Sequence, residues 1–325
     1  MPQTLPNPPA HVQADQPISA PTAIVDAPGA LRFSRLTSLL HLTSLWRLAS
    51  LWHLTSLDAP TVAVVWSLAF AWAAGLRLPP WIPLLLALAA WAVYIADRLL
   101  DARSALRTAN LTTLRERHRF HHRHRRVLFP LAVAAAIAAF WIVFTQMPIA
   151  ARERNSALAV AALAYFTRVH SPFRLPSLGL ARLLKKELLV GLLFTAACAL
   201  PAISRVPNPG PLAAWPLYAA ASFFALLAWL NCHAIEVWES PAWESAISPR
   251  TPKIQTQAGL LALSGIALAF LLGSAHPHPA ALVLCGVAST FLLALLDRQR
   301  HRLTPLALRT AADLVLLTPL ALLLA

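Results

Sequence analysis

The feature that most constrains this chain is a succession of long apolar segments separated by short polar ones. About 20 consecutive apolar residues cross the hydrocarbon core of a bilayer as a helix, which leaves no backbone group unpaired there. The sequence therefore predicts an all-α, polytopic membrane helical bundle of about nine transmembrane helices. The segments of spanning length lie at about residues 59–78, 80–97, 127–146, 156–170, 183–203, 211–235, 257–273, 279–296 and 305–325.

The basic residues set the expected orientation of the bundle. The formal net charge is +14, but no soluble domain is evident that could present the basic residues to nucleic acid, so we expect no nucleic-acid partner. With the N-terminus inside, all but four of the 27 Lys and Arg residues fall in cytoplasmic segments, as the positive-inside rule requires. We expect an integral protein of the bacterial inner (cytoplasmic) membrane with a cytoplasmic N-terminus. The four outer residues are Arg77, Arg152, Arg154 and Arg205.

The chain divides into three predicted regions. Residues 1–30 are rich in Pro, Ala and polar residues, which predicts a disordered tail. Residues 31–58 place Leu at every third position from Leu36 to Leu57, with Trp46 and Trp52 interleaved, which favours an amphipathic helix lying on the membrane surface. A sequence duplication without function explains the same repeat. Residues 59–325 form the predicted transmembrane domain.

Two carboxylates mark the end of the second apolar segment. Asp97 and Asp101 are one helical turn apart, so they leave the same helix face, which Tyr94 shares. Acidic residues at the end of a membrane-length segment are costly unless they are paired, hydrated or bound to a cation. Either they bind a cation, or they form a plain helix end neutralised by Arg98 and Arg103.

A second acidic cluster is predicted on the same side of the membrane. The sixth apolar segment ends with Glu236 and Glu239, preceded by Asn231, and the fifth begins with Lys185 and Lys186. Two carboxylate clusters on one side of a bundle suit a shared divalent cation, and oxygen ligands favour Mg²⁺, which bridges carboxylates to a substrate phosphate. The two lysines could complete a diphosphate site.

Nine spans with acidic motifs at the cytoplasmic ends of the second and sixth resemble the UbiA superfamily of intramembrane prenyltransferases, over roughly residues 59–300. That family's first motif is Asn-Asp-x-x-Asp-x-x-x-Asp, and its last two aspartates match Asp97 and Asp101. Its Asn and first Asp fall on Val93 and Tyr94, so the motif is degenerate here. Further similar positions are Asn231 to Glu239 for the second motif, Tyr165 and Lys185 or Lys186 before the fifth span, and Gly191 and Pro201 within it.

The resemblance implies an activity. Mg²⁺ and basic side chains hold a prenyl diphosphate, its C–O bond ionises, and an aromatic or lipid acceptor captures the allylic cation. The expected partners are therefore a prenyl diphosphate, a hydrophobic acceptor and membrane lipid. The implied catalytic metal ligands are Asp97, Asp101, Glu236 and Glu239; the implied diphosphate-binding and orienting residues are Arg98, Lys185, Lys186, Tyr94, Tyr165 and Asn231.

Two other classes of protein fit the same residues. A non-catalytic protein of this fold would bind an isoprenoid lipid or a partner. A transporter would use the acids as a proton or cation relay, although the two halves of the chain show no internal repeat.

Other polar residues carry weaker predictions. The segment from Arg115 to Arg126 contains His118 and His122 one turn apart, which could bind Zn²⁺, but its arginines favour a solvated basic loop. Asp313 lies one helical turn from Arg309, and we expect the two to form a structural pair within the bundle. We interpret Asp297 as a residue at the boundary of a span.

Overall fold

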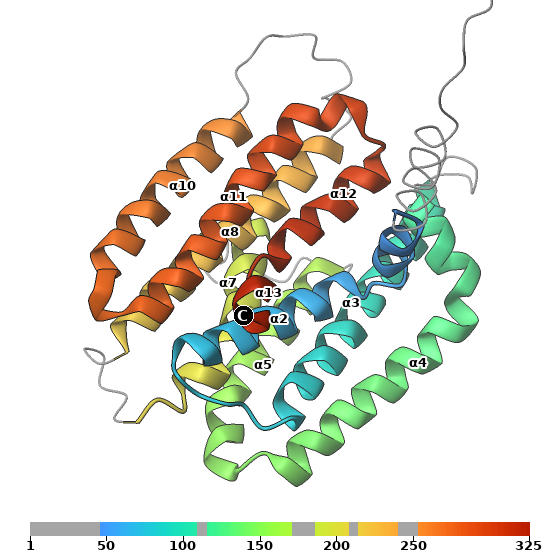
Figure 1. The fold of residues 1–325 in the computed structure, drawn as a ribbon. Helices are drawn as coiled ribbons and strands as arrows, with labels where there is room; N and C mark the ends of the chain where they lie inside the picture. Colours follow the sequence, from blue (N-terminus) through green and yellow to red (C-terminus); the bar gives the residue numbers. More distant parts are fainter. Residues whose placement is uncertain (1–45, 109–115, 171–185, 208–213, 240–252) are drawn as a thin grey trace, which may run out of the picture. The chain divides into compact units, whose positions relative to one another are not determined.

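The computed structural model describes residues 46–108, 116–170, 186–207, 214–239 and 253–325, and in these ranges the fold is helical with no strand (Figure 1). The predicted tail lies outside the described residues. The described helices are Trp46–Leu54, α2 (Asp58–Ala73), α3 (Trp81–Thr108), α4 (Glu116–Gln146), α5 (Ile149–His170), α7 (Lys186–Ile203), α8 (Trp215–Glu239), α10 (Lys253–Leu272), η1 (Gly273–Ala275), α11 (Pro277–Gln299), η2 (Arg300–Arg302), α12 (Pro305–Leu314), η3 (Val315–Leu317) and α13 (Leu320–Leu324).

Six described helices are long and apolar enough to cross a membrane, which supports a polytopic membrane protein. A seventh span results if the helix Trp46–Leu54 and α2, bent by 94° at their junction, are counted together. Each of the nine predicted segments overlaps a described helix, but α5 and the C-terminal helices do not meet the same criteria of length and hydropathy. The number nine therefore stays a prediction. The six spans are Trp81–Leu106, Glu116–Gln146, Lys186–Ile203, Trp215–Glu239, Ile254–Ala275 and Pro277–Arg302.

Two predicted boundaries were wrong. The second segment was expected to end at residue 97, but α3 continues to Thr108, so Asp97 and Asp101 lie within a helix. The segment expected to be a basic loop up to residue 126 is the first part of α4, which begins at Glu116. Arg, Glu and Leu are good helix formers, so a helix can continue past its apolar stretch into polar surroundings.

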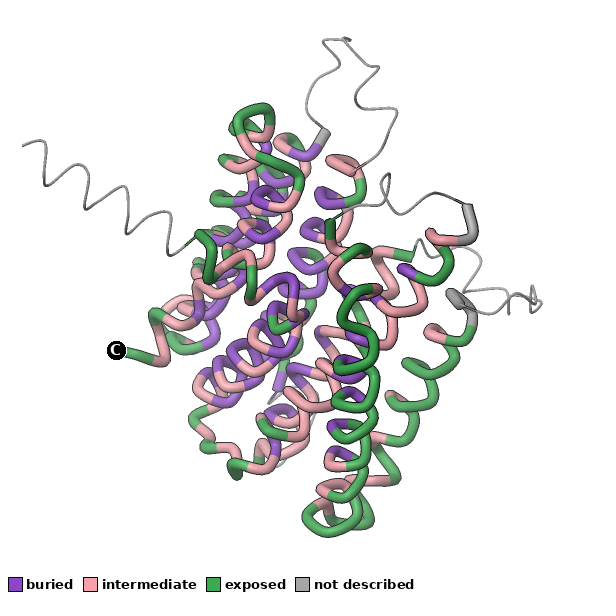
Figure 2. The backbone as a smooth tube through the Cα atoms, turned by 90° about the vertical axis from the view of Figure 1, so that its right-hand side faces the viewer, coloured by how far each residue is buried: buried purple, intermediate pink, exposed green. Residues whose placement is uncertain are grey.

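The core is centred on aromatic side chains of α2 and α8. The Trp66 ring stacks on the Phe224 ring at a centroid distance of 3.7 Å, and Phe70 meets Phe224 edge-on at 6.0 Å. Trp66 Nε1 also donates a hydrogen bond of 2.8 Å to the backbone oxygen of Leu316. Figure 2 shows buried residues along the inner faces of the helices and exposed residues along the outer ones. This arrangement makes α2 a central helix of the bundle.

Helices α7 and α8 approach each other closely at Gly191. A Cβ atom at this position would lie 2.9 Å from the backbone nitrogen of Trp229 and 3.0 Å from the backbone oxygen of Ala225. Only glycine lacks the Cβ that would collide with this neighbouring backbone. The approach fixes the start of α7 relative to the second half of α8, where the predicted acidic residues lie.

Polar contacts join the helix ends at one end of the bundle. Arg117 at the start of α4 and Arg309 of α12 both bond to Glu239 at the end of α8, and Trp238 Nε1 donates to Asp297 of α11. A separate contact joins α7 and α3: Arg205, which follows the end of α7, lies 5.9 Å from the ring centroid of Trp81 at the start of α3. These contacts bring the end of α8 to the start of α4, and the end of α7 to the start of α3.

Candidate functional site

The predicted first acidic pair borders a polar region shared by four helices. Asp97 and Asp101 of α3 are partly buried, and both interact electrostatically with Tyr165 of α5. Tyr165 interacts in the same way with Glu187 of α7 and Cys232 of α8. Tyr165 thus lies near the first acidic pair and near residues of α7 and α8.

Glu187 connects this region to the second acidic cluster. Its side chain shares a hydrogen bond with Glu236 of α8 and interacts electrostatically with His233 and Lys186. Sequence reasoning did not include Glu187 among the site residues, although its place beside the two lysines was the available signal.

Glu239 is held by two arginines. Arg117 donates to Oε1 at 2.9 Å and to Oε2 at 3.1 Å, and Arg309 donates to Oε1 at 2.8 Å. This side chain is 19% exposed. Both of its oxygens therefore serve an ion-pair network that joins α4, α8 and α12.

The predicted diphosphate-binding residues do not share one environment: Arg98 is buried and Lys186 is exposed. Arg98 is 5% exposed, and its guanidinium lies 4.9 Å from the Tyr94 ring centroid, a cation–π distance. Arg98 also interacts electrostatically with Asp97 and Asp101, so it borders the first acidic pair. Lys186 is exposed at the start of α7, whereas Lys185 lies outside the described residues.

Asn231 is buried in α8 at 4% exposure. Its side-chain oxygen has no hydrogen-bond partner among the described residues. An unpaired buried amide oxygen is costly, so this group is available to a donor on a bound molecule or water.

A cluster that sequence reasoning missed lies where the helix Trp46–Leu54 meets α2. His53 Nδ1 is 2.7 Å from Asp58 Oδ2 and 3.2 Å from Asp313 Oδ2 of α12. The predicted structural partner of Asp313, Arg309, instead donates its hydrogen bond to Glu239. Tyr94 interacts electrostatically with Asp58 and Asp313, so it lies near this cluster. The only sequence signal was one His and one Asp flanking the expected helix boundary.

The junction beside this cluster has an unusual backbone. Ser56 adopts a φ of 58°, in the left-handed region that non-glycine residues rarely occupy. Its hydroxyl lies 3.1 Å from His121 Nε2 of α4, and His121 Nδ1 lies 2.8 Å from the backbone oxygen of Arg117. A backbone oxygen only accepts, so His121 carries its proton on Nδ1 and accepts from Ser56 through Nε2.

This contact gives part of the His-rich segment a structural role. His121 is 1% exposed, whereas His124 and Arg123 are exposed on the same helix. The prediction that this segment is basic and solvated is therefore correct for one face of α4 only. Asp297, expected at a boundary, is 1% exposed and accepts bonds from Trp238 and Arg300.

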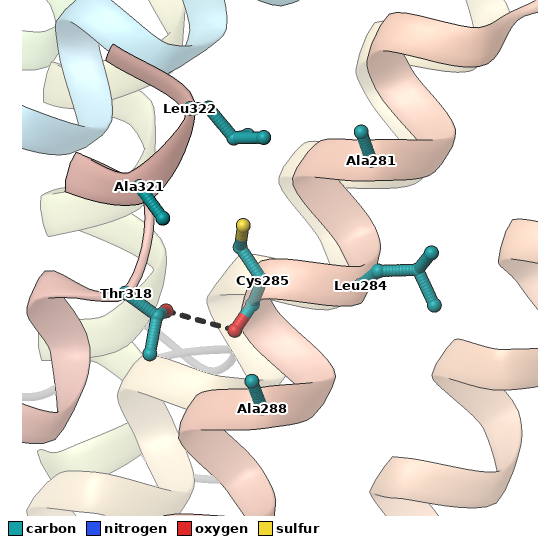
Figure 3. A pocket seen from close by; sticks show the side chains of 7 residues that line it. All are labelled: Ala281, Leu284, Cys285, Ala288, Thr318, Ala321 and Leu322. Carbon is teal, nitrogen blue, oxygen red and sulfur yellow. Dashed lines mark hydrogen bonds between the residues drawn. The ribbon is translucent and has the colours of Figure 1, made fainter. Parts of the chain in front are cut away.

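An open apolar pocket lies apart from these polar residues. Figure 3 shows it between α11 and the C-terminal helix, where Thr318 Oγ1 donates 2.8 Å to the Cys285 backbone oxygen. Its lining contains none of the predicted site residues, and its chemistry suits a hydrocarbon chain. The lining residues are Ala281, Leu284, Cys285, Ala288, Thr318, Ala321 and Leu322.

Comparison of the chain with protein-family models, with curated proteins and with solved structures finds no match.

Proposed function

We propose that this protein is a UbiA-like membrane prenyltransferase that moves a prenyl group from a prenyl diphosphate to an aromatic or lipid acceptor with Mg²⁺. The observation that supports the proposal is that Tyr165 lies within electrostatic reach of acidic residues on two other helices. It interacts electrostatically with Asp97 and Asp101 on one side and with Glu187 on the other, and Glu187 is bonded to Glu236. Acidic groups from α3, α7 and α8 therefore border one polar region.

The residues of this region fit a magnesium ion in their donor chemistry. Asp97, Asp101 and Glu236 offer carboxylate oxygens, and the Asn231 amide oxygen has no hydrogen-bond partner among the described residues. Mg²⁺ bound there would neutralise charge that develops on a leaving diphosphate. Glu239 is the least suitable of the proposed ligands, because Arg117 and Arg309 already engage its oxygens.

Basic and hydroxyl side chains would act on the diphosphate directly. Lys186 interacts electrostatically with Glu187, so its ammonium group lies at the edge of the acidic region. It would neutralise the leaving diphosphate and, together with Arg98, lower the barrier to cleavage of the C–O bond. Tyr165 would orient the substrate, and the apolar surfaces of the helices would accommodate the prenyl chain.

A non-catalytic role for the same fold is the second candidate. Two observations favour it. Glu239 is already bonded to Arg117 and Arg309, and Tyr94 occupies the position of the family's first aspartate. Such a protein would bind an isoprenoid lipid without cleaving a diphosphate.

The two candidates differ in a measurable product. Purified protein in lipid is incubated with labelled prenyl diphosphates and candidate acceptors, with Mg²⁺ or with a chelator, and released diphosphate is scored. An enzyme releases diphosphate only in the presence of the divalent ion. Binding of a prenyl lipid without diphosphate release under every condition would support the non-catalytic role and reject the transferase.

A further inference from the structure

We propose that His53, Asp58 and Asp313 form a binding site for a divalent transition metal of the Zn²⁺ class. One ligand atom from each residue, His53 Nδ1 and the two carboxylate Oδ2 atoms, lies within 4.8 Å of the other two. None of the three residues is among those assigned to the transferase, and the proposal does not depend on that activity.

The three ligand atoms converge on one point in the interior of the bundle. His53 Nδ1 is close to both carboxylates, in ion-pair contacts of 2.7 and 3.2 Å. All three atoms are buried and have no hydrogen-bond partner among the described residues. His53 is 4% exposed and Asp58 1% exposed, so water does not reach them freely. A bound cation would satisfy all three atoms at once.

The spacing of the atoms fits a tetrahedral zinc ion. Zn–N and Zn–O bonds of about 2.0–2.2 Å place neighbouring ligands roughly 3.4 Å apart. The contacts at 2.7 and 3.2 Å need to open only slightly to admit the ion. An imidazole nitrogen ligand favours Zn²⁺ and related transition metals over Mg²⁺, and the two negative carboxylates favour a divalent cation.

The surroundings also orient the ligands. The other oxygen of Asp58, Oδ1, accepts a hydrogen bond of 2.9 Å from the backbone nitrogen of Ala59, which leaves Oδ2 facing His53. Hydrogen bonds of this kind to ligating carboxylates are typical of metal sites. The left-handed backbone at Ser56 turns the chain between His53 and Asp58, so both side chains reach the same point.

Two arginines near the site have other partners. Arg98 and Arg309 both interact electrostatically with Asp58, which opposes cation binding. Arg309, however, donates its 2.8 Å hydrogen bond to Glu239, and Arg98 stacks on Tyr94 while interacting with Asp97 and Asp101. His53 is the side chain in direct ion-pair contact with Asp58 and Asp313, and one imidazole cannot balance two buried carboxylates.

The zinc content of the purified protein tests this site directly. The full chain is purified in detergent, stripped with a chelator, and titrated with Zn²⁺ in excess Mg²⁺, which keeps Asp97 and Asp101 from retaining zinc. Zinc per chain is measured after desalting. We expect one tightly held Zn²⁺ in the unmodified protein and at least about a 100-fold weaker affinity in His53→Gln and in Asp313→Asn, since removing even an outer-sphere partner costs 10–100-fold.

The rival zinc site is on α4, so the control is a double variant, His118→Gln with His122→Gln. We expect this variant to bind zinc as the unmodified protein does. Loss of zinc in the control, or its retention in His53→Gln, overturns the proposal, and so does an unmodified protein that holds no zinc.

A second measurement uses only the unmodified protein, so its result does not depend on whether a variant folds. X-ray absorption at the zinc edge of the loaded, unmodified protein should show a first shell of nitrogen and oxygen at about 2.0 Å with a single imidazole. Two or more imidazoles would assign the ion to the His-rich segment and overturn the proposal.

Discussion

Glu239 and Arg117 form a two-pronged ion pair although 122 residues separate them in the chain. The guanidinium nitrogens lie 2.9 and 3.1 Å from the two carboxylate oxygens, and Arg309 adds a third bond at 2.8 Å. Paired hydrogen bonds of this geometry hold both side chains in one orientation. The pair therefore fixes the end of α8 to the start of α4 and to α12.

Neutralising Glu239 should destabilise the protein. In Glu239→Gln, two mostly buried guanidinium groups lose their counter-charge, and we expect a loss of about 1–3 kcal/mol. Thermal unfolding in detergent, followed by circular dichroism, measures the effect. Adding Arg117→Met should cost little more once Glu239 is neutral, because the two residues act as one unit. The exposed Arg123→Gln on the same helix is the control, and equal effects of Arg123→Gln and Glu239→Gln would contradict the ion-pair network.

A transferase should depend on the charge of Asp97. Asp97→Asn keeps the shape of the side chain but removes the charge that a hard cation needs, so nearly all turnover should be lost. Diphosphate release from a labelled prenyl diphosphate measures turnover. Glu116→Gln changes an exposed acid at the start of α4 in the same way and should leave turnover unchanged. Full turnover in Asp97→Asn would remove this carboxylate from the catalytic site.

Two glycines in helices should respond oppositely to alanine. In Gly191→Ala the new Cβ would lie 2.9 Å from backbone of α8, so the helices must separate and stability should fall by about 1–3 kcal/mol. In Gly259→Ala the Cβ meets nothing within 4 Å, and alanine should stabilise α10 by about 0.5–1 kcal/mol. Unfolding temperatures of the two variants test the close α7–α8 contact. A Gly191→Ala protein as stable as the parent would show that the helices are not in contact there.

The predicted orientation can be tested by labelling. In a cysteine-free background, Arg123→Cys and Arg154→Cys place single thiols on exposed positions near the start of α4 and near the start of α5, which the predicted topology puts on opposite sides of the membrane. The positive-inside rule predicts that a membrane-impermeant maleimide labels Arg154→Cys in intact cells and Arg123→Cys only in inverted vesicles. The reverse pattern would place the N-terminus outside and remove the acidic region from the cytoplasmic side.

Sequence reasoning found most of the helices because each helix is a local property. Runs of Leu, Ala, Val and Trp predict membrane-length helices without knowledge of any neighbour, and nine such runs all overlap described helices. Helix ends were less predictable. The polar residues from Arg98 to Thr108 and from Glu116 to Arg126 form helices as readily as the apolar ones, so hydropathy alone placed both boundaries wrongly.

The polar contacts depended on tertiary structure. The spacing of Asp97 and Asp101 on one turn of helix follows from the sequence, but their common neighbour Tyr165 comes from another helix. His53 and Asp313 are 260 positions apart, and they meet because the backbone at Ser56 turns the first helix by 94° against α2. The sequence by itself determined a helical membrane protein with acidic and basic residues at the helix ends. Only helix packing decided which carboxylates face arginines and which converge on His53, because these choices depend on distances between segments remote in the chain.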